Sequence, residues 1–222
     1  MSLGILGAGV IHPKDLANFI PAPAWRKATR NMIMAVKSME QALLQTPMLM
    51  EQKRSDLGLV VGTSSGEIET SAEFIITLAK TGVARPLLFQ NSLHNATSGF
   101  ASIHFGITGP TFSISDRERT PVEAMYLADL LLEEKACGAV IETLVEVHKV
   151  MADYMGETVM EGACTLIFGS RQMAEDLRTP FIEVDMESVA QKYLVNPAHM
   201  PLFDITQSEF YQTAMALSGK HV

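Results

Sequence analysis

The feature that most constrains this chain is a predicted strand, a charged turn and a helix that follow one another between Ile107 and Leu132. Gly109-Pro110 predicts a tight turn, and the short alternating run Thr111–Ser115 predicts a strand. Thr120 and Glu123 have the spacing of a capping box, which predicts that a helix starts at Thr120. In such an arrangement the turn holds a side chain near the positive end of the helix dipole, where several α/β enzymes place their nucleophile.

The turn between this strand and this helix contains no nucleophile. It reads Asp116-Arg117-Glu118-Arg119, so a carboxylate lies between two arginines, and the turn has neither Cys nor Ser after Ser115. Glu118, Arg117 and Arg119 could act as an acid/base and an anion clamp, with His94 as a further proton carrier. The alternative is an ion-paired turn that has no chemical role.

The composition argues against several classes of function. Lys and Arg number 17 against 25 Asp and Glu, a net charge of −8, which argues against binding to nucleic acid or to anionic membranes. No apolar stretch approaches the ~18 residues of a membrane span, and the N-terminus shows no signal peptide. Cys137 and Cys164 have neither metal-ligand nor C-x-x-C spacing. We therefore expect a reduced, cytoplasmic protein with no metal and no other cofactor.

The rest of the chain alternates between strand-like and helix-like segments, which predicts an α/β fold. Gly7-Ala8-Gly9 is interpreted as a turn that ends the first strand, because the third glycine of a dinucleotide fingerprint is missing. Glu142 and Glu146 lie near the end of a strand, either as an acid/base pair or as solvated side chains. Strands are expected near residues 3–6, 57–61, 139–144, 162–169 and 181–186, and helices at 26–45, 68–80, 97–105 (buried) and 207–217.

Read in order, these pieces resemble the N-terminal half of the beta-ketoacyl synthases. The resemblance extends from Gly4 to about Gly169, and it depends on the order and spacing of several short motifs. They are Gly7-x-Gly9-x-x-x-Pro13, Leu59-Val60-Val61-Gly62-Thr63 with Gly66, Pro86-x-x-Phe89 with Asn91, Asn95 and Gly99, Phe105-Gly106-Ile107-x-Gly109-Pro110, and Glu161-Gly162-Ala163.

The resemblance implies a thiolase-like fold, of which this chain would contain a single, truncated half: a mixed five-stranded sheet with buried helices. Residues 1–190 are expected to form the ketosynthase-like domain, and residues 191–222 an extension packed on it. The candidate ligand-binding residues are Phe89, Asn91, Arg117 and Arg119.

Two departures from the family predict that the chain does not condense acyl groups. Counting from Gly109-Pro110, the family's catalytic Cys falls on Glu118. A carboxylate there would form a high-energy anhydride instead of a stable acyl-enzyme, and it would repel an incoming malonyl group. The family's two catalytic histidines belong to a second half, which would begin where this sequence stops.

Such a chain resembles the chain-length factors, which lack the Cys and pair with an active ketosynthase in polyketide or aryl-polyene synthesis. Family members dimerise by antiparallel pairing of the strand that matches Thr111–Ser115, so we expect a homodimer or a heterodimer with a ketosynthase. An acyl carrier protein is another candidate partner. Arg26, Lys27 and Arg30 form the one compact basic patch for it, although the net charge opposes docking. The alternative function is an enzyme with altered thioester or carboxylate chemistry at Glu118.

Overall fold

A six-stranded mixed β-sheet forms the core of the chain in the computed structural model, which describes residues 3–156, 160–185 and 208–219. Its strand order is β3-β2-β4-β5-β1-β6. The sheet has one strand more than the five that the resemblance implies, and the sixth, the two-residue β6, is shorter than the strand expected at residues 181–186. The strands are β1 (Gly4–Ile11), β2 (Leu57–Gly62), β3 (Thr111–Ile114), β4 (Ala139–Glu146), β5 (Gly162–Gly169) and β6 (Ile182–Glu183).

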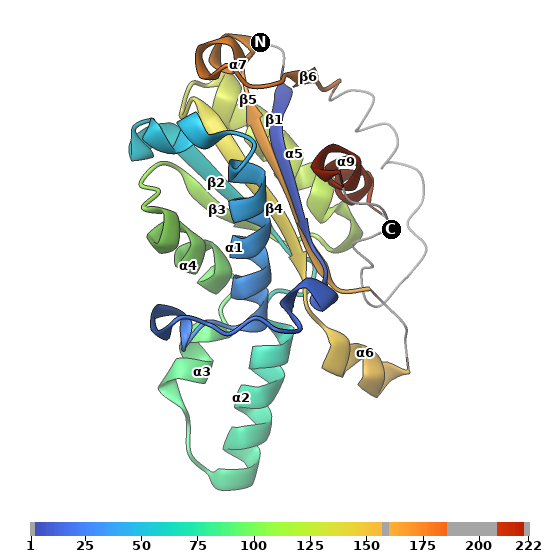
Figure 1. Cartoon of the computed structure of the whole chain (residues 1–222). Helices are drawn as coiled ribbons and strands as arrows, with labels where there is room; N and C mark the ends of the chain where they lie inside the picture. Colours follow the sequence, from blue (N-terminus) through green and yellow to red (C-terminus); the bar gives the residue numbers. More distant parts are fainter. Residues whose placement is uncertain (1–2, 157–159, 186–207, 220–222) are drawn as a thin grey trace.

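Helices cover both faces of this sheet. Helices α1 and α4 lie on one face and α5 and α9 on the other, while α2 and α3 extend beyond the end of the sheet (Figure 1). The described α-helices are α1 (Arg30–Leu43), α2 (Ile68–Thr81), α3 (Pro86–Asn91), α4 (Ala96–Phe105), α5 (Thr120–Glu133), α6 (Lys149–Met155), α7 (Arg171–Leu177) and α9 (Glu209–Ser218). None of them is long and apolar enough to cross a membrane.

The sheet changes direction at its centre. Strands β3, β2 and β4 are parallel, whereas β4, β5, β1 and β6 pair antiparallel. The carboxyl ends of the three parallel strands therefore meet at one end of the sheet, where open α/β sheets gather their ligands. The short strand β3 forms one edge of the sheet, and nothing in the described part of the chain pairs with its outer side.

The interpretation of Gly7-Ala8-Gly9 as a turn is wrong, because both glycines lie inside β1. They are needed for close packing of α1 on the strand. A Cβ at Gly7 would lie 2.8 Å from the Ala42 carbonyl oxygen, and one at Gly9 would lie 2.1 Å from that of Ser38. No local pattern around Gly7 and Gly9 indicates this contact, because α1 lies about thirty residues further along the chain.

Helix α5 begins at Thr120, as predicted, but without the capping box. The Thr120 hydroxyl instead accepts a hydrogen bond from the backbone N–H of Asp116 at 2.9 Å, and no side chain caps the helix. The reason is a 3-10 turn at Arg117–Arg119, which runs directly into α5 and gives Thr120 a helical backbone.

Five other helices differ from the prediction. Helix α1 begins at Arg30 instead of residue 26, because Thr29 caps it through its hydroxyl after a short turn at Pro23–Trp25. Helix α4 is not fully buried, since Ile103 is exposed on one flank. Helices α3, α6 and α7 were not predicted, because their six or seven residues carry too short an apolar pattern.

The helix predicted at residues 207–217 is α9, which packs on β1 and β5. Its buried residues Phe210, Tyr211, Ala214 and Met215 complete the core on that face. Residues 186–207 lie outside the described part, so the division of the chain at residue 190 stays a prediction.

Candidate functional site

The turn after β3 presents Glu118 at the N-terminal end of α5, as the sequence predicted. Glu118 is half-buried, and its carboxylate forms no hydrogen bond or ion pair within the described residues. Arg119 pairs with Glu123 and with Asp116, the latter at 3.7 Å, so it does not clamp Glu118. Arg117 is exposed and has a left-handed backbone, with φ of 47°. The predicted group of one carboxylate and two arginines is therefore not an ion-paired unit.

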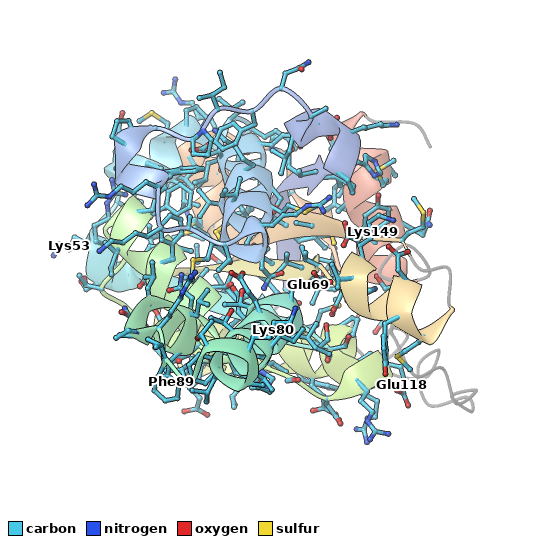
Figure 2. All side chains as sticks on the ribbon, turned by 90° about the horizontal axis from the view of Figure 1, so that it is seen from below. Lys53, Glu69, Lys80, Phe89, Glu118 and Lys149 are labelled. Carbon is cyan, nitrogen blue, oxygen red and sulfur yellow. The ribbon has the colours of Figure 1, made fainter. Side chains whose placement is uncertain are left out.

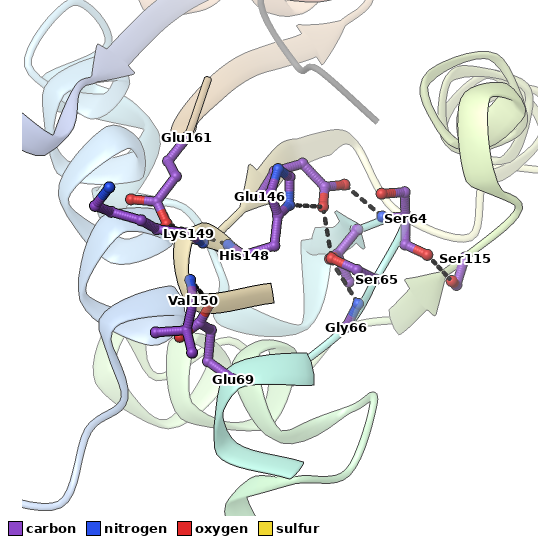
Figure 3. Close-up of polar contacts among 11 residues, drawn as sticks. Ser64, Ser65, Gly66, Glu69, Ser115, Glu146, His148, Lys149, Val150 and Glu161 are labelled. Carbon is purple, nitrogen blue, oxygen red and sulfur yellow. Dashed lines mark hydrogen bonds and ion pairs between the residues drawn. The ribbon is translucent and has the colours of Figure 1, made fainter. Parts of the chain in front are cut away.

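Glu146, the last residue of β4, connects this strand to the loop that follows β2. The buried Glu146 carboxylate accepts hydrogen bonds from the Ser64 N–H and from the Ser65 hydroxyl, the latter at 3.0 Å (Figure 3). The Ser115 hydroxyl donates to the Ser64 carbonyl at 3.3 Å, which connects the turn after β3 to the same loop. Side chains from all three parallel strand ends are thus joined in one polar cluster.

His148 is the side chain of this cluster that sequence reasoning missed. It is fully buried, and its Nδ1 lies 3.6 Å from Oε2 of Glu146. Neither ring nitrogen has a hydrogen-bond partner within the described residues. Its position just after a strand that carries two glutamates was the one available signal.

Two further carboxylates hold the segment that follows β4. Glu161 accepts from the backbone N–H groups of His148 and Lys149, at 3.2 and 2.7 Å, and pairs with Arg30 at 2.9 Å. Glu69 accepts from the Val150 N–H at 2.7 Å. These contacts satisfy the free donors at the start of α6. These two carboxylates hold the backbone of the segment in place, and their role here is structural.

Glu142 and Glu146 are neither solvated nor paired with each other. Both are buried on the same face of β4, and four residues of strand separate them by roughly 13 Å. No partner reaches either oxygen of Glu142 in the described structure, and burial raises the pKa of its carboxyl well above the ordinary value. Burial without a partner among the described residues thus favours the neutral form of the Glu142 carboxyl, and the solvated interpretation is wrong.

The other candidate residues, Phe89, Asn91 and His94, contact residues outside the turn that carries Glu118. Figure 2 shows Phe89 and Glu118 on opposite sides of this end of the molecule. The Phe89 ring packs on Phe74, and the Asn91 amide donates to the Lys27 carbonyl at 2.8 Å. His94 lies against Gly66, which has a left-handed φ of 61°. None of these contacts involves a residue of the turn that carries Glu118.

The base of α2 is anchored by Glu67, which sequence reasoning also missed. Its buried carboxylate accepts hydroxyl hydrogen bonds from Thr97, Thr29 and Thr70 at 2.7, 2.8 and 3.1 Å. Burial raises the pKa of this carboxyl, and the three hydroxyls lower it in part.

Neither cysteine replaces the missing nucleophile. Burial raises the pKa of the Cys137 thiol to about 11 and that of Cys164 well above its ordinary value. Thiols so protonated do not attack thioesters at neutral pH. In the described ranges, no group of three His, Cys, Asp or Glu side chains could hold a metal ion.

The open edge of β3 is the second notable feature of this region. The Pro110 and Ile114 carbonyls accept from β2, so the N–H and C=O groups of Thr111 and Ser113 point away from the sheet. Large apolar side chains around this edge are exposed to solvent. They are Ile103 on α4 (84%), Phe112 on β3 (42%), and Tyr126 (45%) and Leu130 (51%) on α5.

Comparisons with known proteins agree with this architecture. Residues 28–154 match the family model of the beta-ketoacyl synthase N-terminal domain. No curated protein matches the sequence significantly. At identities of 12–16%, the likeness to the solved structures below shows a shared thiolase-like ketosynthase fold.

Three solved structures illustrate that likeness. A type II polyketide synthase complex, AntDE:AntF, of an acyl-carrier protein with its ketosynthase matches at TM-score 0.70 and 16% identity, over 81% of this chain and 66% of that one. The ishigamide ketosynthase/chain length factor matches at TM-score 0.67 and 12% identity, over 79% of this chain and 64% of that one. The ketosynthase ApeO with its chain length factor ApeC, from Xenorhabdus doucetiae, matches at TM-score 0.61 and 15% identity, over 77% of this chain and 79% of that one. The chain thus spans less than two thirds of the first two matched chains.

Proposed function

Because this chain belongs to the beta-ketoacyl synthase N-terminal domain family, we propose that it is a cytoplasmic, non-catalytic partner of an active ketosynthase, of the chain-length-factor type. Polyketide or fatty-acid synthesis is the setting. The observation that carries the proposal is that two features occur together at one end of the fold. They are an acid at the nucleophile position and an open, apolar strand edge beside it.

The chemistry at the tip of α5 supports the non-catalytic half of this proposal. A helix N-terminus stabilises a carboxylate, so it makes Glu118 a poorer nucleophile, not a better one. An acyl group on Glu118 would be an anhydride, which water hydrolyses. After incubation with acyl-CoA or acylated carrier protein, mass spectrometry should find the chain unmodified, and stable acylation would contradict the proposal.

The open edge of β3 supports the partner half of the proposal. An unpaired edge flanked by exposed apolar side chains invites pairing with another strand. The named neighbours include ketosynthases solved together with a chain length factor. We therefore favour antiparallel pairing of β3 with the matching edge strand of a ketosynthase, with a homodimer as the competing outcome.

A proline at Ser113 tests the pairing directly. The Ser113 N–H points away from β2, so Ser113→Pro removes an outward donor and leaves the β2–β3 hydrogen bonds intact. Ser113→Ala is the matched control, since it removes only the hydroxyl that contacts Ser98 at 2.8 Å. The tagged chain should co-purify with a host protein that mass spectrometry identifies as a Cys-bearing ketosynthase. Ser113→Pro should lose this protein and Ser113→Ala keep it, whereas recovery of a lone monomer would refute the proposal.

An acyl carrier protein is the second proposed partner, and it would bind transiently. Arg26 and Lys27, just before α1, and Arg30, its first residue, are exposed, although Arg30 is already paired with Glu161. Reversing Arg26 and Lys27 to Glu should weaken binding of a purified carrier protein to the complex. Unchanged affinity at low salt would exclude this patch as the docking site.

The alternative of altered chemistry at Glu118 rests on one observation, the lack of any partner for that half-buried carboxylate in the described structure. It remains testable by the Glu118→Gln variant described in the Discussion.

A further inference from the structure

Helix α4 contains a glycine that no contact within the described chain requires. Gly99 lies in the middle of α4, and a Cβ built on it meets no atom within 4 Å. Glycine weakens a helix interior relative to alanine, so a reason for it is expected. Gly9 has such a reason, because α1 packs against it, whereas no described residue packs against Gly99.

Gly99 lies beside the open edge of the sheet. The preceding residue, Ser98, contacts Ser113 of β3 through its hydroxyl, and Thr97 faces α1 through its contact with Asn31. Helical spacing then places Gly99 on the flank of α4 that points away from α1. Ile103, one turn further on, is 84% exposed on that outer side.

We propose that Gly99 is the close-contact residue of the partner interface, at which the backbone of a partner helix lies directly against α4. This rests on the proposed function. A ketosynthase shares this fold, so pairing of edge strand with edge strand brings the helix beside its own edge opposite α4. The partner must then carry a small residue, Gly, Ala or Ser, where it faces Gly99.

Because of this contact, Gly99→Ala should stabilise the free chain but weaken the complex. Gly99→Ala improves the helix, so the melting temperature of the free chain should rise by about 2–4 °C. The added methyl group should weaken binding to the purified ketosynthase partner about 5- to 100-fold, as for overpacking of a tight contact. Gly99→Leu should abolish the complex. Ala216→Leu is the control, since Ala216 is exposed on α9, far from β3.

Sedimentation and calorimetric titration of the chain with the ketosynthase measure these effects. Wild-type affinity in Gly99→Leu, with the fold intact by circular dichroism, overturns this inference and leaves the proposed pairing standing. A wild-type chain that binds no ketosynthase overturns both. Parallel loss of affinity in Ala216→Leu would also overturn it, because the effect would then be nonspecific.

Discussion

The two edges of the sheet differ in what covers them. On the β1 side, β6 pairs with the strand and α9 buries Phe210 and Tyr211 against it, so all eight residues of β1 are buried. On the β3 side, nothing described pairs with the strand, and Phe112 and Ile103 remain exposed. The chain thus covers much of the β1 side by itself and leaves the β3 edge open, and β3 is where the proposed partner would bind.

The largest effect is expected on the closed side. Tyr211 is buried, and its hydroxyl lies 2.9 Å from Nδ1 of His12. Tyr211→Ala should lower the free energy of unfolding by about 3–5 kcal/mol, because it leaves a cavity and breaks this contact. Urea unfolding measures the loss. A change below about 1 kcal/mol would mean that α9 is not part of the core.

In the core between the two edges, the buried Glu142 should make the stability of the chain depend on pH. Burial raises the pKa of Glu142, so the folded chain keeps a proton that the unfolded chain releases at the ordinary carboxyl pKa. This group's contribution to stability is therefore fully present below the unfolded pKa and is lost as the pH rises toward the folded pKa. The stability of Glu142→Gln relative to wild type should accordingly increase as the pH rises above the ordinary carboxyl pKa. A pH-independent difference between the two unfolding free energies would show that Glu142 is not held neutral.

At the open edge, unlike the closed one, a substitution should change partner binding more than it changes the stability of the free chain. Phe112 is 42% exposed, so Phe112→Ala should cost the free chain only about 1 kcal/mol or less. The same variant should weaken association with the ketosynthase, because the ring would be buried at the interface. If the variant unfolds readily but associates normally, the ring belongs to the core of the free chain and not to an interface.

The smallest effect is expected at Glu118. Its carboxylate has no partner within the described residues, so Glu118→Gln should change the free energy of unfolding by about 0.5 kcal/mol or less. Partner binding should also be unchanged. The variant and the wild type are compared in hydrolase and decarboxylase screens. An activity that is present in the wild type and lost in Glu118→Gln would establish the alternative, catalytic function.

The sequence predicted elements whose signals are local. Strands β2, β4 and β5 are apolar runs bounded by turns, and Pro121 marks the start of α5. Gly7 and Gly9 were misinterpreted because the reason for them is a helix far along the chain. A similar limit applies to the site: Glu118 was found by counting from Gly109-Pro110, whereas the burial of Glu146 and the approach of His148 depend on loops from three strands.

Amide exchange along β3 tests the central claim most directly. The Phe112 and Ile114 N–H groups point toward β2, and those of Thr111 and Ser113 point outward. Measured residue by residue by NMR, Phe112 and Ile114 should be protected in both the free chain and its ketosynthase complex. Thr111 and Ser113 should exchange rapidly in the free chain and become protected in the complex. Rapid exchange at Thr111 and Ser113 in the complex would contradict pairing at this edge.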